Sequence, residues 1–267
     1  MSKISDPARD FTDLCLRLRS GPGDKQGAQT LATRFEVEPW STDFMLILAS
    51  IHQRIEALRI MISKTELDDD IKGAAFGCLG QIRTAFSENG LQNQWQHSIT
   101  NFLSDTYLTP IRMTSGYVRV HNGYQVPDDD ELADMVSEIE TLRGWLIEID
   151  LVEKDFIRGA LIEGLDAFLF RVKRVGYYGW PDSFEALKAV VAAYMALERG
   201  APDPNVSPPY EATLKKVGEF LSKTFDRVKS TKEVTEVGDW LLRGYVALQA
   251  VGHVQPAVAG LLTHAVG

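Results

Sequence analysis

Residues 42–63 read TDFMLILASIHQRIEALRIMIS, and this stretch decides the class of fold. Its apolar residues recur at steps of three and four, the spacing that places side chains on one face of an α-helix. Alternation with period two, which is typical of half-buried strands, is nearly missing from the chain. The sequence therefore predicts an amphipathic helix over Thr42–Ser63 whose core face carries Phe44, Ile47, Leu48, Ile51, Ile55, Leu58 and Ile62.

The same helical period continues on both sides of this stretch. It predicts helices over Leu67–Phe86 and Leu91–Thr106, before Pro110 interrupts the pattern. It also predicts a short N-terminal helix with Phe11, Leu14, Cys15 and Leu18 on its apolar face. The acidic runs Asp68–Asp70 and Asp128–Asp130 are interpreted as helix starts, because carboxylates stabilise the positive end of a helix.

Two short patterns return in the second half of the chain. The sequence IEALR at Ile55–Arg59 is echoed by IETLR at Ile139–Arg143, 84 residues later, and IKGA at Ile71–Ala74 by IRGA at Ile157–Ala160, at an offset of 86. We interpret the echo as the duplication of a helical unit. Chance similarity between amphipathic helices stays open as the alternative, and superposition of the two hairpins would decide between them.

One strand signal separates the proposed copies. Val118–His121 and Tyr124–Val126 flank Asn122–Gly123, a dipeptide that favours the positive backbone angles of a two-residue hairpin turn. The sequence therefore predicts a small β-hairpin here.

The predicted fold is all-α, with helical hairpins in two duplicated units, one small β-hairpin insertion and a C-terminal helical unit, together one compact body. The expected order is a helical arm over residues 1–40, repeat units over 41–113 and 128–200, the β-hairpin connection over 114–127, and a proline-rich connection with the C-terminal helical unit over 201–267.

Composition restricts the classes of partner and compartment. The chain has 267 residues, 37 of them acidic and 28 basic, so its formal charge of -9 gives no basic footprint for nucleic acid. Cys15 and Cys78 are 63 residues apart without CxxC spacing, which supplies neither a disulfide framework nor a zinc site. No apolar signal sequence lies near the N-terminus. The sequence predicts a cytoplasmic protein.

Motifs for catalysis are missing from the sequence. It contains no phosphate-binding loop and no nucleophile elbow, so no cofactor is predicted. His52 and Glu56 lie one helical turn apart and could share a metal ion, but an exposed intrahelical pair is favoured and no metal is predicted. Gly73, Gly77 and Gly80 share one helix face, where we expect a neighbouring backbone to pack closely.

Two segments could bind a partner. Residues 171–180 combine cations with aromatic residues, a pattern that could bind bases or phosphates. The same residues are also typical of the C-terminal end of a helix, and this alternative stays open. The candidate binding residues are Arg171, Lys173, Arg174, Tyr177, Tyr178 and Trp180, together with His121 and Asn122 of the predicted hairpin. The second segment is a locally basic helix with Lys215, Lys216, Lys223 and Arg227, in which Glu219 is expected to pair with neighbouring lysines on a solvated face.

Residues 244–267 contain no Asp, Glu, Lys or Arg. Their polar side chains and Pro256 favour a core-forming or oligomer-forming helix pair over a membrane span. The predicted function is a non-catalytic helical interaction or regulatory protein with a protein partner, and a homo-oligomer is left open. The alternatives are an enzyme, either a hydrolase or metal-dependent, with a site of dispersed histidines and carboxylates, and a membrane-associated accessory or effector protein that uses this tail.

Overall fold

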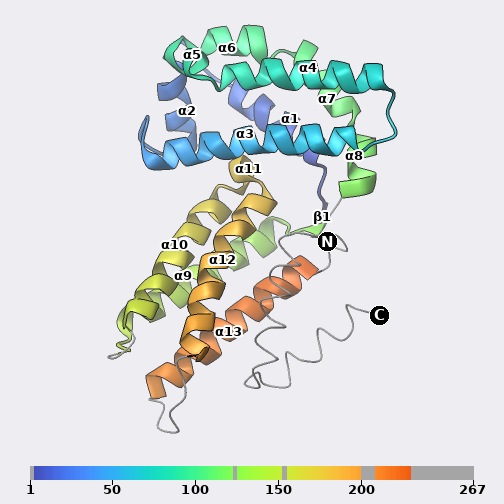
Figure 1. The fold of residues 1–267 in the computed structure, drawn as a ribbon. Helices are drawn as coiled ribbons and strands as arrows, with labels where there is room; N and C mark the ends of the chain where they lie inside the picture. Colours follow the sequence, from blue (N-terminus) through green and yellow to red (C-terminus); the bar gives the residue numbers. More distant parts are fainter. Residues whose placement is uncertain (1–2, 123–124, 152–154, 200–207, 230–267) are drawn as a thin grey trace. The chain divides into compact units, whose positions relative to one another are not determined.

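The computed structural model describes residues 3–122, 125–151, 155–199 and 208–229, and these residues are predominantly helical (Figure 1). The prediction of an all-α fold is therefore confirmed. The first half contains β1 (Lys3–Ile4), α1 (Pro7–Arg19), α2 (Gly27–Phe35), α3 (Thr42–Ser63), α4 (Asp69–Ala85), α5 (Glu88–Gln92), α6 (Trp95–Phe102), α7 (Asp105–Met113) and α8 (Ser115–Asn122). The second half contains β2 (Gln125–Val126), α9 (Asp129–Glu148), α10 (Asp155–Lys173), α11 (Val175–Tyr178), α12 (Trp180–Arg199) and α13 (Pro208–Lys229).

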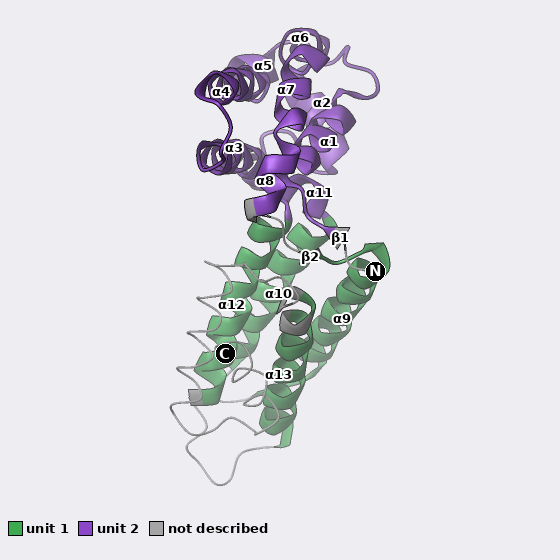
Figure 2. Ribbon diagram, turned by 90° about the vertical axis from the view of Figure 1, so that its right-hand side faces the viewer, with its two compact units in different colours: residues 1–3, 124–173, 180–267 green, residues 4–123, 174–179 purple. Residues whose placement is uncertain are grey.

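The helices form two compact units, coloured separately in Figure 2. Unit 2 holds α1 to α8 together with α11, and unit 1 holds α9, α10, α12 and α13. The main boundary lies between residues 123 and 124. The short segment Arg174–Gly179 belongs to unit 2, although it comes from the second half of the chain.

Helix α3 supplies the largest apolar face of unit 2. It begins and ends at the predicted residues, Thr42 and Ser63, and its N-cap Ser41 accepts a hydrogen bond from the backbone N–H of Phe44. All seven residues of its predicted core face are buried. Helices α2, α4, α8 and α11 pack against α3, so that face lies at the centre of the unit.

Arginine side chains fasten α11 to the rest of unit 2. The Arg54 guanidinium donates to the carbonyl oxygens of Gly176 and Tyr177 at 3.1 and 2.8 Å, and Arg17 donates to Gly176 at 3.0 Å. The Ser50 hydroxyl donates to the carbonyl of Tyr178 at 3.2 Å. These donors satisfy carbonyl groups that so short a helix leaves without backbone partners.

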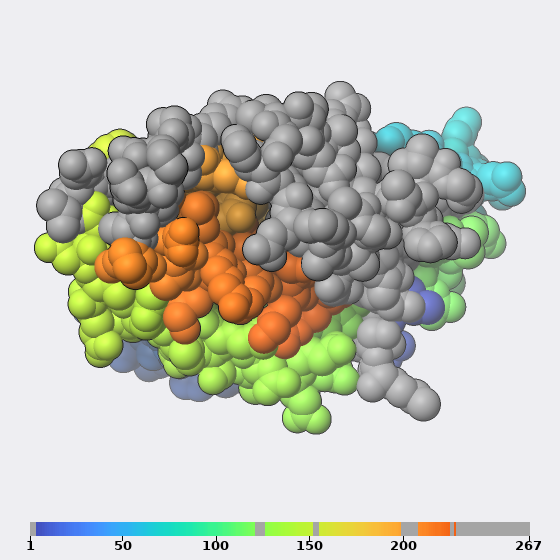
Figure 3. Space-filling model, turned by 90° about the horizontal axis from the view of Figure 1, so that it is seen from below, coloured from blue at the N-terminus to red at the C-terminus, as the bar shows by residue number. Residues whose placement is uncertain are grey.

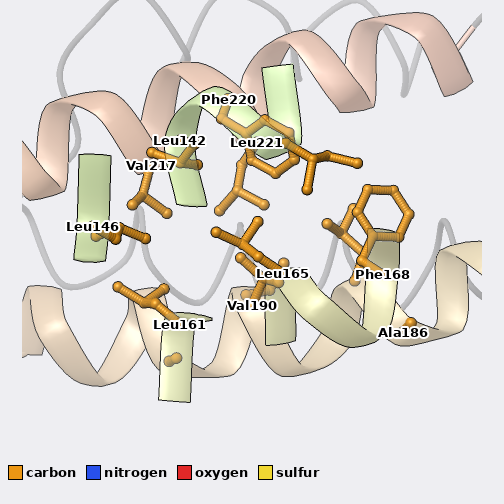
Figure 4. Close-up of a cluster of buried hydrophobic side chains, with 14 of the residues drawn as sticks. Leu142, Leu146, Leu161, Leu165, Phe168, Ala186, Val190, Val217, Phe220 and Leu221 are labelled. Carbon is orange, nitrogen blue, oxygen red and sulfur yellow. The ribbon is translucent and has the colours of Figure 1, made fainter. Parts of the chain in front are cut away.

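Unit 1 packs α10 against α9 and α12, and α13 against α9 and α12. Asp128 and Glu131 form a capping box at the start of α9, which confirms the interpretation of this acidic run as a helix start. Figure 4 shows the side chains that point toward one another from the four helices: Leu142, Leu146, Leu161, Leu165, Phe168, Ala186, Val190, Val217, Phe220 and Leu221.

The predicted β-hairpin is wrong. Residues 118–121 lie in α8, because Val118 continues the buried line of Ile111 and Thr114 at steps of three and four. Gln125 and Val126 form β2, whose strand partner is β1.

The single helix predicted over 91–106 is divided among α5, α6 and α7. A tertiary contact interrupts it, since the Gly27 N–H donates to Asn93 and the Trp95 N–H donates to Lys25. Pro110 lies inside α7 and does not end it.

The proposed duplication is not supported. Ile71 of α4 is 47% exposed, whereas its counterpart Ile157 of α10 is 4% exposed. The surroundings differ as well, because α4 packs mainly on α6 and α7 while α10 packs mainly on α12. The short sequence echo therefore coincides with two different packing environments.

Candidate functional site

The most exposed apolar line on unit 2 crosses from α7 to α8. Met113, Tyr117 and Val120 have exposed fractions of 75%, 51% and 78%. Thr114, the single residue between the helices, has nearly helical backbone angles of φ -77° and ψ -9°. The steps of four and three residues therefore place the three side chains on one face. We call Met113, Gly116, Tyr117 and Val120 the α7–α8 stripe.

A shallow hollow of about 340 Å³ lies at this stripe and is lined by Glu66, Gly116, Tyr117 and Val120. A Cβ atom built on Gly116 would meet nothing within 4 Å. The missing side chain therefore leaves the α8 backbone open to close approach from outside the unit.

Charged groups border the stripe. Arg119 and Glu66 are both exposed, and neither forms an ion pair with another residue that the structure describes. Arg112 lies 3.8 Å from Asp13, a distance at which an exposed ion pair contributes little. The Arg119 and Glu66 side chains therefore remain accessible to a partner, whereas Arg112 and Asp13 offset each other's charge.

The opposite face of α7 and α8 is firmly held. Ile111, Thr114 and Val118 are buried, and the Ser115 hydroxyl donates to the Asp6 carboxylate. Helix α8 packs against α1 and α3. The stripe is consequently presented on a helix fixed by its inner face, which lowers the entropic cost of binding.

The structure separates the binding residues predicted from the sequence. In unit 2, the Arg174 guanidinium donates to the carbonyls of Phe35 and Glu36, and the Tyr177 hydroxyl donates to the carbonyl of Arg34 at 2.8 Å. The Tyr178 side chain is buried, 2% exposed. These three residues therefore contribute internal contacts.

The other members of that segment lie in unit 1. Arg171 bonds Asp182, Lys173 pairs with Glu140 at 2.6 Å, and the Trp180 ring stacks on Phe184 at a centroid distance of 5.4 Å. Neither unit alone gathers the full set.

His121 and Asn122 are the last residues of α8, next to the stripe, and their side chains lie outside the described atoms. Sequence reasoning reached α8 through a turn signal and missed Met113, Tyr117 and Val120. Their i, i+4, i+7 spacing was the available signal. A second apolar line along α7 and α8, through Ile111 and Val118, has the same period and packs into the core. The sequence pattern alone therefore did not show which of the two faces is exposed.

The histidine–carboxylate pair is occupied by structural contacts. His52 Nε2 lies 3.3 Å from the carbonyl oxygen of Phe86, while Glu56 pairs with Arg83 at 3.0 Å and with Arg59 at 3.9 Å. Among the described residues, no group of three or more His, Cys, Asp or Glu is placed to hold a metal ion. Asp68 is the N-cap residue of α4, which confirms a helix start there.

The expected close packing at Gly73, Gly77 and Gly80 is wrong. A Cβ built at any of the three meets no atom within 4 Å. Their spacing does place them on one face of α4, but all three are exposed and no described residue packs on that face.

The basic helix α13 uses its cations on α9. Arg227 forms a bidentate pair with Glu138 at 2.7 and 3.1 Å, and Lys216 lies over the Trp145 ring at 5.0 Å. The predicted pairing of Glu219 with neighbouring lysines is not found among the described residues. A hollow of about 240 Å³ lies between α9 and α13, whose surfaces adjoin in Figure 3.

The uncharged stretch 244–267 lies outside the described residues. Of the helices that are described, none combines the length and apolar character that crossing a bilayer requires.

Both cysteines are free, and burial controls their reactivity. Burial raises the pKa of the Cys15 thiol to about 12, although the nearby Arg54 guanidinium lowers it in part, and partial burial raises the pKa of Cys78. At pH 8 the thiolate fraction of Cys15 is therefore about a thousandfold smaller than that of a thiol with pKa 9. We expect a thiol reagent to spare Cys15 in the folded protein and to modify both cysteines in urea, as measured by mass spectrometry.

The same shift predicts a loss of stability in alkali. The folded state retains the Cys15 proton at pH values where the unfolded thiol has already ionised, so the free energy of unfolding should fall as the pH rises from about 9 toward 12. Cys15→Ala should start less stable, because it leaves a cavity, and should lose less stability over that pH range. An equal pH dependence of the two proteins in urea titrations would contradict the assignment to Cys15.

Comparison of the chain with protein-family models, curated proteins and solved structures found no match in any of the three. The functional argument therefore depends on the geometry of the described residues.

Proposed function

We propose that this chain is a non-catalytic interaction protein that binds an amphipathic helix of another protein along the α7–α8 stripe. The observation that carries the proposal is the outward line of Met113, Tyr117 and Val120 beside an apolar hollow. Exposed apolar patches rimmed by polar residues are typical of interaction sites, and aromatic residues and Met are enriched in the cores of interfaces.

The geometry favours a helix as the occupant. The stripe has the spacing of one helix face, so a second helix can pack its own i, i+3, i+4 and i+7 residues against it. The gap at Gly116 would accept a large side chain of the partner. Arg119 and Glu66, which form no ion pair with a described residue, favour a partner helix that carries carboxylates on one flank and a cation where it meets Glu66.

The proposal is tested by photocrosslinking in the cells that express the protein. A benzoylphenylalanine in place of Tyr117 should form an adduct with one protein, and mass spectrometry should map the adduct to a segment with helical apolar periodicity. The matched control carries the same group in place of Phe156, an equally apolar residue that is 75% exposed on unit 1. We expect no adduct with the same segment from that position.

Val120→Glu gives the quantitative test. A carboxylate at the C-terminal end of the stripe, beside the apolar hollow, should weaken binding of the crosslinked segment at least tenfold, because an unpaired charge would be buried in the complex. The free energy of unfolding should change by less than about 0.5 kcal/mol, since Val120 is exposed. An adduct to a second copy of this chain, or no adduct at position 117, would contradict the proposed partner.

Two other expectations from the sequence stand as proposals beside this one. Self-association through the uncharged tail is tested by sedimentation of the full chain and of the chain truncated after Arg243. A cytoplasmic location agrees with the two free cysteines, and fluorescence imaging of the tagged chain would test it.

A further inference from the structure

A second exposed apolar surface lies at the loop between α2 and α3, at the N-terminal end of α3, whereas α8 lies at its C-terminal end (Figure 1). Trp40, Met45 and Leu46 have exposed fractions of 50%, 50% and 44%. We call these three residues the Trp40 corner.

A chain of aromatic rings supports Trp40 from the core. The Tyr177 ring packs edge-on against Phe35 at a centroid distance of 4.9 Å, Phe35 lies 5.9 Å from Phe44, and Trp40 packs edge-on against Phe44 at 5.8 Å. Phe35 and Phe44 are buried. Trp40 is therefore a rigid ring held on one edge and open on the other, as in preorganised binding surfaces.

The loop holds Trp40 in an unfavourable backbone conformation. Trp40 has a φ of 63° and Glu36, at the other end of the loop, has a φ of 56°. Residues with a Cβ rarely adopt this left-handed region, and such outliers occur often at binding sites. Trp40 is 50% exposed, so its ring is accessible from outside the unit although its backbone is strained.

The charges around the corner are mainly negative. Glu36 and Glu38 lie in the loop and Asp43 in the first turn of α3, and none of their carboxylates pairs with another described residue. The nearby Arg174 guanidinium donates to the carbonyls of Phe35 and Glu36. Glu36, Glu38 and Asp43 therefore lie close together along the chain without an ion pair to a described residue, and this negative charge favours a cationic partner.

We propose that the Trp40 corner binds a segment of another protein that combines lysine or arginine with aliphatic or aromatic residues. The apolar side chains of the segment would pack on Trp40, Met45 and Leu46, and its cations would meet Glu36, Glu38 and Asp43. A cation can also lie over the exposed face of the tryptophan ring. This surface is separate from the α7–α8 stripe, so it does not depend on the function proposed above.

Peptide display tests the proposal with the full chain as bait and the Trp40→Gly variant as counter-selection. Glycine tolerates the left-handed conformation, which offsets part of the packing that is lost against Phe44, so this variant should stay folded with a modest loss of thermal stability. Peptides enriched on the wild type and lost on the variant should carry Lys or Arg beside apolar residues. Their measured affinity should fall at least tenfold with Trp40→Gly.

Three controls make the outcome decisive. Glu38→Lys should weaken the same peptides severalfold, with a smaller effect in high salt. Ile60→Ala, which truncates a residue 55% exposed farther along α3, and Val120→Glu on the stripe should leave their affinity unchanged. The proposal is overturned if no selected peptide depends on Trp40, or if the dependent peptides are acidic or uncharged.

Discussion

Replacing Trp95 with alanine is expected to lower the free energy of unfolding of unit 2 by about 4 kcal/mol. Trp95 is fully buried at the start of α6, and its ring lies 6.0 Å from that of Phe86. Its indole N–H donates to the carbonyl oxygen of Leu18 at 2.9 Å. Truncation would remove a large apolar surface and leave a cavity among α1, α2 and α6.

Trp95→Phe separates the packing from the hydrogen bond. Phenylalanine retains most of the ring volume but lacks the N–H donor. The Leu18 carbonyl keeps a second donor, because the Arg34 guanidinium also bonds to it, so no unsatisfied oxygen remains. We expect Trp95→Phe to cost about 1 to 2 kcal/mol. Urea titrations followed by circular dichroism measure both variants, and equal losses would contradict this account.

Hydrogen exchange should locate the Trp95→Ala effect. Each unit has its own buried core, so protection should fall first in peptides from α1 and α6. Peptides from α10 and α12 of unit 1 provide the internal comparison. A loss confined to α10 and α12 would be inconsistent with the position of Trp95.

Helix periodicity predicted most of what faces the core. The seven apolar residues of α3 are all buried, and so are Phe11, Leu14, Cys15 and Leu18, the apolar face predicted for the N-terminal helix. The spacing of apolar residues fixes the phase of a helix relative to its own axis. It carries no information about which other helix covers that face, and this is why the duplication seemed plausible from the sequence.

Segments governed by tertiary contacts were not predictable in the same way. The Asn122–Gly123 dipeptide favours a hairpin locally, but burial of Val118 between α1 and α3 stabilises helix α8 up to Asn122. Likewise, α5 and α6 are separated because residues 93 and 95 bond to the backbone of residues 25 and 27. In both places a contact distant in sequence outweighs the local preference.

The candidate surfaces were missed for a related reason. Sequence reasoning assigned apolar residues to the core and searched for binding residues among cations and tyrosines. Arg174 and Tyr177 instead bond to backbone carbonyls, while Met113, Val120 and Trp40 face outward. The exposed fraction of an apolar residue decides whether it belongs to the core or to a possible binding surface. That fraction depends on how several helices pack together in three dimensions.

The structure places close backbone contacts at other glycines than the three of α4 for which the sequence predicted them. Gly27 and Gly90 lie where α2 meets α5. A Cβ at Gly27 would come within 2.6 Å of the Gly90 carbonyl oxygen, and one at Gly90 would overlap the Ala85 carbonyl oxygen and lie 2.7 Å from that of Thr84. The atoms in the way are backbone atoms, which cannot rotate aside as a side chain does.

We therefore expect one substitution to have opposite effects at two kinds of site. Gly27→Ala and Gly90→Ala should each lower the free energy of unfolding by about 3 kcal/mol, because the backbones must separate. Gly77→Ala should raise it by about 0.5 to 1 kcal/mol, because alanine forms helix better and the new methyl group meets nothing within 4 Å. Parallel urea titrations measure the three variants. A destabilised Gly77→Ala would imply that a partner or an undescribed segment covers the outer face of α4, and a neutral Gly27→Ala would remove the proposed close contact between α2 and α5.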